Sequence, residues 1–502
     1  MSTKRTRDSL NGGSGTLVYH SDDVDSPKSK RGTRKVDVNK AVGIPTPPTI
    51  EDLEPAADTK ILCNLYSESV QAKIWGIAQI ALNKSAPPIL YPEYTVPGGT
   101  SYVYREFDFW TSGFFPGSLY LILERQRKFP QFTSPWPSSS LSPTPHILQW
   151  QFACQWWTLN LHQNSKLGTT HDLSFMISPW ARKAWELDRD PKAYETLITA
   201  AQTLATRYNS KTKSLRSWDT CVTKRYSFMD PSLDFLVIID NMLNLDLLFW
   251  AATELRDPTL RNIAISHAKT SQKHHVRSDS STLHVVNFDQ ATGAVKAKMT
   301  NQGYSDDSCW SRGQAWAITG FAQTYGWTHE PSFLTTAREC ADYFLAHLPD
   351  SGIPPWDFAD PSTTERPTDT SAAMVACFGM LLLHEALTAM GEPSPYLKGA
   401  LHMLTSVCES QMSPEAHFHS KPVEIASVEH GVSSKAGTLE VDMGGGAETI
   451  LLGATINNYE FAPRRWADHG LVYADYYFLL VGNKLLDMGI GGHFVRPWKG
   501  VD

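Results

Sequence analysis

The 502-residue chain has few cysteines and no long hydrophobic run. Its seven cysteines are scattered singly from Cys63 to Cys408, without a CxxC pair or a spacing typical of zinc sites. No uninterrupted span of about 18 apolar residues predicts a membrane helix, and the N-terminus lacks the apolar stretch of a signal peptide. We therefore expect mostly buried, reduced thiols and a cytoplasmic protein.

The chain also lacks an excess of positive charge, because 45 Lys and Arg residues face 52 Asp and Glu residues and the formal net charge is -7. Such a chain has no overall attraction for nucleic acid or for anionic membranes, so we expect neither as a partner. The sequence also lacks GxxxxGK, a dinucleotide-binding fingerprint, GxSxG and HExxH. Acid–base chemistry without a metal or an organic cofactor is therefore the leading class of activity.

The sequence does contain a repeated pair of predicted helices, which recurs every ~60 to 75 residues. The first helix of each pair opens on a polar and aromatic cluster: HDLSFMISPW from His171, IIDNMLNLDLLFW from Ile238, DDSCWSRGQAW from Asp306 and DTSAAMVACFGMLLL from Asp369. The second opens on an acidic residue and proline, a typical helix start. These starts are Asp190-Pro191, Asp257-Pro258, Glu330-Pro331 and Glu392-Pro393.

Further helical patterns flank the four pairs, at residues 61–82, from about Trp110, from residue 147, and in a last pair at 446–458 and 468–489. With hardly any strand pattern, these segments predict an all-α fold, and the economical architecture is an (α/α)6 barrel, a toroid of six helical hairpins. An open superhelical array fits the same pattern. In a closed ring, all the first helices would begin at one end and gather their polar clusters there.

The N-terminal residues differ from this helical body. Residues 1–58 are rich in charge, Ser, Gly and Pro and poor in large apolar residues, which predicts a disordered tail before a catalytic domain over residues 59–502. Two later segments predict long loops: the Pro/Ser-rich residues 131–146 and the polar, Gly/Ser-rich segment from Ser413 to Gly446.

Two aspartates are the candidates for acid–base chemistry. Asp240 lies between apolar residues on both sides, and a carboxyl group in a dry pocket has the raised pKa that a general acid needs. A helix N-cap, or a buried Asp held by backbone amides, explains its pattern equally well. Asp172 follows His171 before another apolar helix, so it is either a second carboxylate near the reacting bond or an ordinary cap.

Arg312 lies two residues after Trp310. A guanidinium beside an aromatic face suits an anionic sugar, while the alternative is an ion pair with Asp306 or Asp307 that ties the loop to the helix. His284 has no metal partner at a suitable spacing and taken alone is typical of a structural histidine. Aromatic faces also bind sugar rings, although most of the sixteen tryptophans are expected in the core.

These motifs resemble those of the unsaturated glucuronyl hydrolases, glycoside hydrolase family 88. The resemblance runs from about Lys60 to Gly489, and its strongest signatures are FWTSGFFPGSLY, HDLSF, IIDNMLNLDLLFWA, NQGYSDDSCWSRGQAW, WDF followed by DTSAA, and YADYYFLL. It implies an (α/α)6 barrel and a glycosidase. The substrate it implies is an oligosaccharide made by a polysaccharide lyase, from whose non-reducing end the enzyme removes a 4,5-unsaturated glucuronic acid.

The resemblance also implies a mechanism and a set of site residues. A general acid protonates C4 of the unsaturated sugar, water adds at C5, and the resulting hemiketal opens and releases the rest of the oligosaccharide. By motif position, Asp240 is the acid and base, and Asp172 binds sugar hydroxyls and helps set the charge state of Asp240. The implied substrate contacts are Trp110, His284, Gln302, Trp310 and Arg312. No metal and no organic cofactor are implied.

One segment departs from the family pattern. HGVSSKAGTLEVDMGGG, from His430, keeps the serines and glycines of a late substrate loop but lacks its tryptophan, which leaves the leaving sugar and any sulfate preference open. An unsaturated galacturonyl-rhamnose hydrolase would use the same acids. A non-catalytic carbohydrate-binding barrel would tolerate the loss of Asp240, and a polysaccharide lyase would need a Tyr/His base pair. The oligomeric state is not specified.

Overall fold

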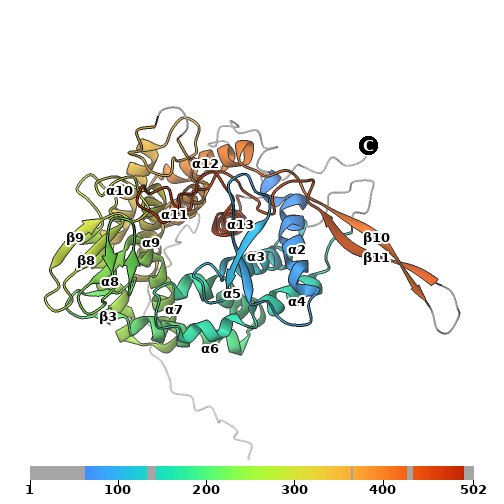
Figure 1. The fold of residues 1–502 in the computed structure, drawn as a ribbon, viewed down its shortest axis with the longest axis horizontal. Helices are drawn as coiled ribbons and strands as arrows, with labels where there is room; N and C mark the ends of the chain where they lie inside the picture. Colours follow the sequence, from blue (N-terminus) through green and yellow to red (C-terminus); the bar gives the residue numbers. More distant parts are fainter. Residues whose placement is uncertain (1–62, 133–142, 363–365, 427–432, 491–502) are drawn as a thin grey trace, which may run out of the picture. The chain divides into compact units, whose positions relative to one another are not determined.

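A computed structural model describes residues 63–132, 143–362, 366–426 and 433–490 (Figure 1). These residues all belong to the second of two compact units into which the chain divides, Pro55–Asp502. The predicted disordered tail, residues 1–58, lies outside the described ranges, as does most of the Pro/Ser-rich loop.

Helices dominate the described residues, as the sequence predicts. Twelve α-helices lie in these ranges: α2 Glu68–Leu82, α3 Phe114–Lys128, α4 Ile147–Thr158, α5 Leu173–Asp188, α6 Pro191–Ala205, α7 Leu245–Leu255, α8 Pro258–His274, α9 Ser311–Thr328, α10 Pro331–His347, α11 Thr370–Ala389, α12 Tyr396–Ser410 and α13 Val472–Asp487. A 3-10 helix, η5 (Ile239–Asn244), precedes α7 directly.

Three of the four acid–proline starts are confirmed, since Asp190, Asp257 and Glu330 occupy the N-cap positions of α6, α8 and α10. The fourth prediction is wrong, because α12 begins at Tyr396. Glu392 instead helps to end α11: its backbone N–H bonds to the Leu387 carbonyl, just after Gly391 in the left-handed conformation. Because these residues form the C-terminal end of α11, they are not available to start the next helix.

The helices alternate along the chain between an inner ring and an outer layer. Each inner helix contacts the next, in the order α3, α5, α7 with η5, α9, α11 and α13, and α13 contacts α3 (Figure 1). The outer helices α4, α6, α8, α10 and α12 pack on α3, α5, α7, α9 and α11 respectively. Consecutive helices are therefore hairpin neighbours, and the first and last inner helices of the described chain meet.

Strands are more numerous than the sequence predicts, and they lie in the connections between helices. The hairpins are β1 Leu90–Thr95 with β2 Tyr102–Glu106, β3 Tyr208–Asn209 with β4 Ser214–Leu215, β5 Cys221–Val222 with β6 Ser227–Phe228, and β10 His417–Ala426 with β11 Ser433–Asp442. β7 Phe235–Ile238, β8 Val285–Phe288 and β9 Val295–Met299 form an antiparallel sheet. β7 leads directly into η5, so this sheet positions Asp240.

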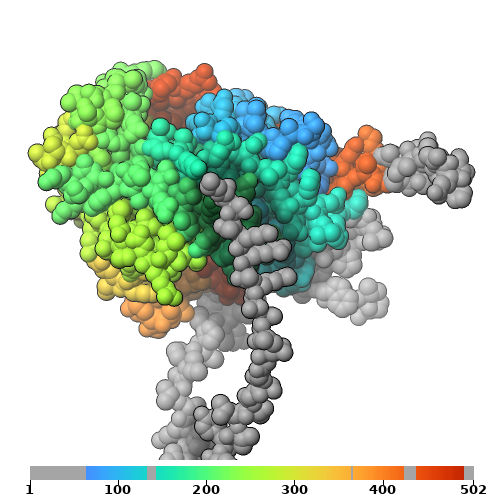
Figure 2. Space-filling view, turned by 90° about the horizontal axis from the view of Figure 1, so that it is seen from below, coloured from blue at the N-terminus to red at the C-terminus, as the bar shows by residue number. Residues whose placement is uncertain are grey.

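Between Ser413 and Gly446 most of the described residues form two long paired strands and not the predicted loop. β10 and β11 pair antiparallel along their whole length and project from the helical body (Figures 1 and 2). Gln79 on α2 anchors the hairpin by donating to the Leu439 carbonyl at 2.9 Å. His417 and His419 of β10 are exposed on either side of the buried Phe418, and Leu439 and Val441 alternate with polar residues in β11. A short alternating strand pattern is therefore present in the sequence, although the surrounding Gly, Ser and polar residues also fit a loop.

The helix expected at residues 446–458 is absent. The segment runs extended and forms isolated bridges, including Met412 with Leu451. The buried Asp475 carboxylate on α13 accepts hydrogen bonds from the backbone N–H groups of Ile450 and Leu451, both at 2.9 Å. These two N–H groups therefore bond to a side chain of another element and not to the carbonyl groups of a helix.

Within the described ranges, α11 is the one helix long and apolar enough to cross a bilayer by length and composition. It packs between α9 and α13, and most of its residues are buried, as in the core helices of large helical domains. Close approach in the ring depends on glycine: a Cβ added at Gly379 of α11 would lie 2.6 Å from Thr319 Oγ1 of α9.

We predict that Gly320→Ala destabilises the protein. A Cβ at Gly320 would lie 2.5 Å from the Met242 Cβ, so α9 must move away from η5, which carries Asp240. The free energy of unfolding, measured by urea denaturation, should fall by about 1–3 kcal/mol. Gly326→Ala on the same helix is the matched control: its Cβ would meet no atom within 4 Å, so stability should hold or rise by up to ~1 kcal/mol. Equal losses in both variants would contradict this account.

Candidate active site

The inner helices begin with polar and aromatic residues that meet at one end of the ring. Asp172, Trp310 and Asp369 occupy the N-cap positions of α5, α9 and α11, Asp240 lies in the first turn of η5, and Tyr473 is the second residue of α13. The predicted gathering of the helix starts is therefore observed among the described residues.

Asp240 carries a partly exposed carboxyl group whose Oδ1 atom is buried without a hydrogen-bond partner among the described residues. Burial, and to a smaller extent the Asp172 charge, raise its pKa to about 7, against the opposing effects of the Arg312 charge and of its own backbone N–H. The N-cap interpretation does not hold, because Ile238 occupies the N-cap position of η5. The carboxyl group is thus poised to exchange a proton near neutral pH.

Asp172 sits at the N-cap of α5, yet its side chain makes no capping hydrogen bond. The capping role falls to a neighbour, because Asn244 of η5 accepts from the Ser174 backbone N–H at 2.9 Å. The Asp172 carboxylate instead accepts from Thr170 Oγ1 at 2.9 Å and lies 3.2 Å from the buried His171 Nε2. Its side chain is 15% exposed, so it remains able to accept a bond from a ligand.

Arg312 is buried and joins three segments. It donates to the Asp369 carboxylate at 2.6 Å, to the carbonyls of Thr455 and Ile456 at 2.7 and 2.8 Å, and to Gln302 Oε1 at 2.9 Å. The alternative prediction of a structural ion pair is therefore observed, although the partner is Asp369 and neither of the acids just before the helix.

The Arg312 guanidinium also lies between aromatic rings. It is 4.6 Å from the centroid of the Trp310 ring and 5.4 Å from that of Tyr473. Asp306, the acid expected as its partner, instead pairs with Arg225 at 2.6 Å. Long-range packing therefore decides the partners of both charged groups.

His284 is buried beside Trp310, with 4.7 Å between the ring centroids. Its Nδ1 accepts from the Asn301 backbone N–H at 3.1 Å, and burial, reinforced by the Arg312 charge, lowers its pKa to about 3. The imidazole is therefore neutral with its proton on Nε2. Nε2 is buried without a partner among the described residues, which leaves a donor free for a ligand.

Trp110 and Gln302 are both partly exposed at this end of the ring. Trp110 packs against Phe175 and Tyr473, with ring centroids 5.8 and 5.2 Å apart. Because Arg312 holds the Oε1 atom of Gln302, the amide nitrogen of Gln302 points away from it. Trp110 can thus offer an aromatic surface and Gln302 a donor.

Three further residues belong to the site but were not predicted for it. Asp369 and Tyr473 lie within motifs that the sequence makes visible, and the buried Tyr473 hydroxyl has no partner among the described residues. Trp218 forms an isolated bridge with Thr170 and meets His284 edge-on at 5.9 Å between centroids. No motif surrounds Trp218, so only the fold places it here.

The late segment that borders the site is not the one expected. The described part of the stretch after His430 forms β11, which packs on α2. Instead, residues 454–469 contact the site: Asn457 donates to the Asn301 carbonyl at 3.2 Å and pairs with Trp466. This bordering segment carries a tryptophan, Trp466, which the stretch from His430 lacks.

Among the described residues, no group of three or more His, Cys, Asp or Glu side chains is arranged to hold a metal ion.

No family model matches the chain. It is 31% identical over 309 residues to the unsaturated chondroitin disaccharide hydrolase of Streptococcus pyogenes serotype M1, covering 62% of this chain and 68% of the relative. The same-named enzyme of Streptococcus agalactiae serotype III is 30% identical over 393 residues, 77% and 84% of the two chains. The unsaturated glucuronyl hydrolase of Formosa agariphila is 38% identical over 278 residues, and the match spans 55% of this chain and 63% of that enzyme.

Solved structures agree with these relatives. An unsaturated glucuronyl hydrolase specific for heparin is 26% identical with a TM-score of 0.65, and the match covers 86% of this chain and 98% of the other. The enzyme from Bacillus sp. GL1 is 23% identical with a TM-score of 0.66, covering 87% and 100%, a likeness that supports the fold alone.

The helical fold and the relatives, which are named as hydrolases of unsaturated uronides, place this chain among the glycoside hydrolases. Its relatives place it further: the chain belongs to the unsaturated glucuronyl hydrolases, glycoside hydrolase family 88.

We predict that Asp240→Asn raises the unfolding temperature at pH 8 and has little effect at pH 4. The pKa of Asp240 lies at about 7 in the folded protein and ordinarily near 3.8, so raising the pH through this window ionises the unfolded chain first and lowers stability. An amide side chain does not ionise, so the Asp240→Asn variant does not lose this stability at high pH. Thermal unfolding at both pH values measures the difference, with the exposed Asp307→Asn as control. If the Asp240→Asn variant were less stable than wild type at pH 8, the explanation that burial of the ionised Asp240 carboxylate lowers stability would be contradicted.

Proposed function

We propose that this protein releases 4,5-unsaturated glucuronic acid from the non-reducing end of oligosaccharides, and that its helices form an (α/α)6 barrel. The single observation that carries the activity is the Asp240 carboxyl group, which has a pKa of about 7 and lies at the polar end of the ring. The closed order of inner-helix contacts supports the barrel. Membership in the family supports both.

In the proposed reaction, Asp240 is the general acid. The C4=C5 bond of the substrate is an enol ether, so C4 is electron-rich and accepts the Asp240 proton while positive charge develops at C5 and the ring oxygen. Water then adds at C5 and gives its proton to the Asp240 carboxylate, which restores the acid. The hemiketal so formed opens, and the leaving sugar departs. Only water is consumed, so the proposal includes no cofactor.

The other site residues bind and orient the sugar. Trp110 offers an aromatic surface to the apolar face of the ring. His284 Nε2 and the Gln302 amide nitrogen are donors for sugar oxygens, because their other polar atoms are already held by Asn301 and Arg312. Asp172, with lone pairs left beyond its bond to Thr170, accepts from sugar hydroxyls.

Arg312 and Trp310 act by position and charge. The terminal nitrogens of Arg312 already donate to protein oxygens, so its role is to hold Gln302 and to supply positive charge near the substrate carboxylate. Its charge also counters the rise in the pKa of Asp240. Trp310 packs between Arg312 and His284 and so fixes the orientation of both.

The compartment proposed is the cytoplasm. The six cysteines with described side chains are all free thiols, and five of them are buried. Unpaired cysteines are typical of proteins kept in a reducing environment.

The proposed activity predicts that the protein bleaches the ultraviolet absorbance of the conjugated C4=C5 uronate in unsaturated disaccharides. A panel of chondroitin-, heparin- and gellan-type substrates, with unsaturated galacturonyl-rhamnose included, separates the leaving-sugar preferences. Asp240→Asn should lower kcat by about 10²–10⁴-fold, while Asp307→Asn, beside the site but exposed, should retain activity. Rising absorbance on intact polymer would identify a lyase, and full activity of Asp240→Asn would refute the assigned acid.

The pH dependence tests the electrostatics of the two acids. Because Asp240 must be protonated, kcat/KM should fall above about pH 7 by about tenfold per pH unit. The Asp172 charge raises the pKa of Asp240, so Asp172→Asn should move this limb to lower pH. A limb that stays in place in the Asp172 variant would show that the two carboxylates do not interact.

A further inference from the structure

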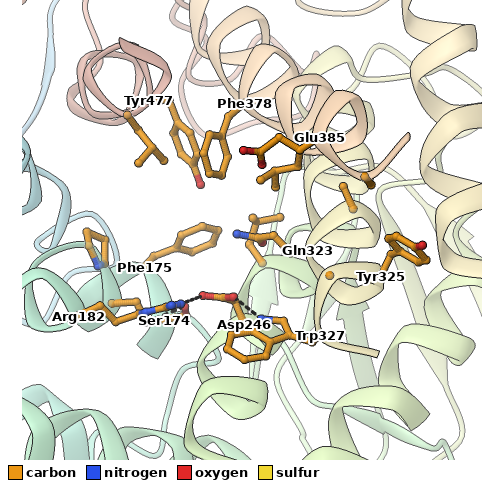
Figure 3. A pocket seen from close by; sticks show the side chains of 18 of the residues that line it. Ser174, Phe175, Arg182, Asp246, Gln323, Tyr325, Trp327, Phe378, Glu385 and Tyr477 are labelled. Carbon is orange, nitrogen blue, oxygen red and sulfur yellow. Dashed lines mark hydrogen bonds and ion pairs between the residues drawn. The ribbon is translucent and has the colours of Figure 1, made fainter. Parts of the chain in front are cut away.

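A cavity lies inside the inner ring and reaches the C-terminal ends of α9 and α11. It has a volume of about 750 Å³ (Figure 3). Its lining extends along most of α5, from Ser174 to Glu186, and includes the C-terminal halves of α9 and α11, the middle of α13, and Asp246 in the first turn of α7. Along α9 its lining begins at Ala322, about 15 Å from Arg312 at about 1.5 Å per residue. Such a volume is within the ~300–1,000 Å³ range of small-molecule sites.

A layer of aromatic rings separates this cavity from the candidate active site. Phe114 contacts Phe175, Phe175 contacts Trp316, Trp316 contacts Tyr477, and Tyr477 contacts Phe114, with centroid distances of 5.6, 5.3, 5.7 and 6.3 Å. All four side chains are at most 5% exposed. This closed ring of four side chains crosses the inside of the helical ring, so a ligand in one site does not reach the other.

Charged side chains line the cavity, but each of the main ones is paired. Arg182 donates to the Asp246 carboxylate, which also accepts from Trp327 Nε1 at 2.7 Å (Figure 3). Glu385 pairs with Lys484 at 2.5 Å. An ionic ligand would have to break one of these pairs, so the cavity suits a neutral ligand.

The polar atoms that remain suit hydroxyl groups. Gln323 Oε1 is buried without a partner among the described residues, and its side chain reaches toward the middle of the cavity (Figure 3). Each oxygen of the Asp246 carboxylate makes one of the bonds given above and keeps a lone pair for another donor. A ligand with several O–H groups would satisfy these acceptors.

Aromatic faces complete the cavity. Tyr477 and Phe378 lie on one side, and Tyr325 and Trp327 on the other (Figure 3). Aromatic rings facing a few fixed acceptors are the arrangement that binds a pyranose, whose C–H face is apolar and whose rim is hydroxylated. We propose that this cavity is a second carbohydrate site, specific for a neutral mono- or disaccharide and independent of the catalysis proposed above.

Binding of neutral sugars to the full-length protein tests the proposal. Glucose, N-acetylglucosamine, N-acetylgalactosamine and rhamnose are titrated by saturation-transfer NMR, and crystals are soaked with the tightest binder. We expect at least one sugar to bind with millimolar affinity and to occupy the cavity. Absence of binding for all four at about 50 mM, or occupancy only beside Asp240, would overturn the proposal.

Variants locate the binding. Gln323→Leu removes the free acceptor and should weaken binding about tenfold, while Gln163→Leu, at an exposed position on another segment, should leave it unchanged. Ala389→Trp fills the cavity from an exposed position at the end of α11, so it should abolish sugar binding without disturbing the buried core. Undiminished binding by Ala389→Trp would overturn the proposal.

The two proposals fail separately. Asp240→Asn should keep its sugar affinity within about twofold, and an unsaturated disaccharide bound to that variant should not displace the neutral sugar. Gln323→Leu should turn over unsaturated disaccharides at the wild-type rate. Displacement of the neutral sugar by the unsaturated disaccharide would assign the sugar binding to the catalytic site. If the wild-type protein bound neutral sugars but did not turn over any unsaturated disaccharide, only the proposed catalysis would be refuted.

Discussion

The buried ion pair between Arg312 and Asp369 is the interaction on which the polar end of the ring depends. It links the start of α9 to the start of α11, and Arg312 also holds the backbone at Thr455 and Ile456. Breaking such a buried pair by removing one partner costs about 3–5 kcal/mol, because the other charge is left uncompensated. The pair therefore fixes the distance between two inner helices and the charge beside Asp240.

Around this pair, neighbouring segments supply one another's missing hydrogen bonds. Asn244 of η5 satisfies an N–H group at the start of α5, so the Asp172 carboxylate is released from capping. Gln302 and His284 each have one polar atom held by the protein and another left over. Helix N-termini also carry partial positive charge, so this end of the ring suits a substrate with a carboxylate. In the cavity on the other side of the aromatic layer the charges are paired, as those of Arg182 and Asp246 are.

Local sequence rules explain the elements that were predicted correctly and also the failure of the fourth acid–proline start. Acid–proline starts depend on two adjacent residues, and three of the four hold; the fourth fails because Glu392 is needed to end α11. The extended run after Gly446 has a helical pattern, but Asp475, far along the chain, takes two of its backbone donors. The β10–β11 hairpin shows apolar alternation only over short stretches, at Phe418 and at Leu439 and Val441, so its sequence also fits a polar loop.

The sequence by itself determined the helical class and the family, and it marked Asp240 and Asp172 as the candidate acids, since motifs, caps and periodicity are properties of neighbouring residues. The tertiary structure decided the partner of Arg312, the burial that raises the pKa of Asp240, the proton position on His284 and the presence of Trp218 beside it. It also decided which late segment borders the site. Each of these depends on contacts between groups that lie 17 to more than 140 residues apart in the sequence. Such contacts are set by the packing of the whole fold and not by the preferences of neighbouring residues.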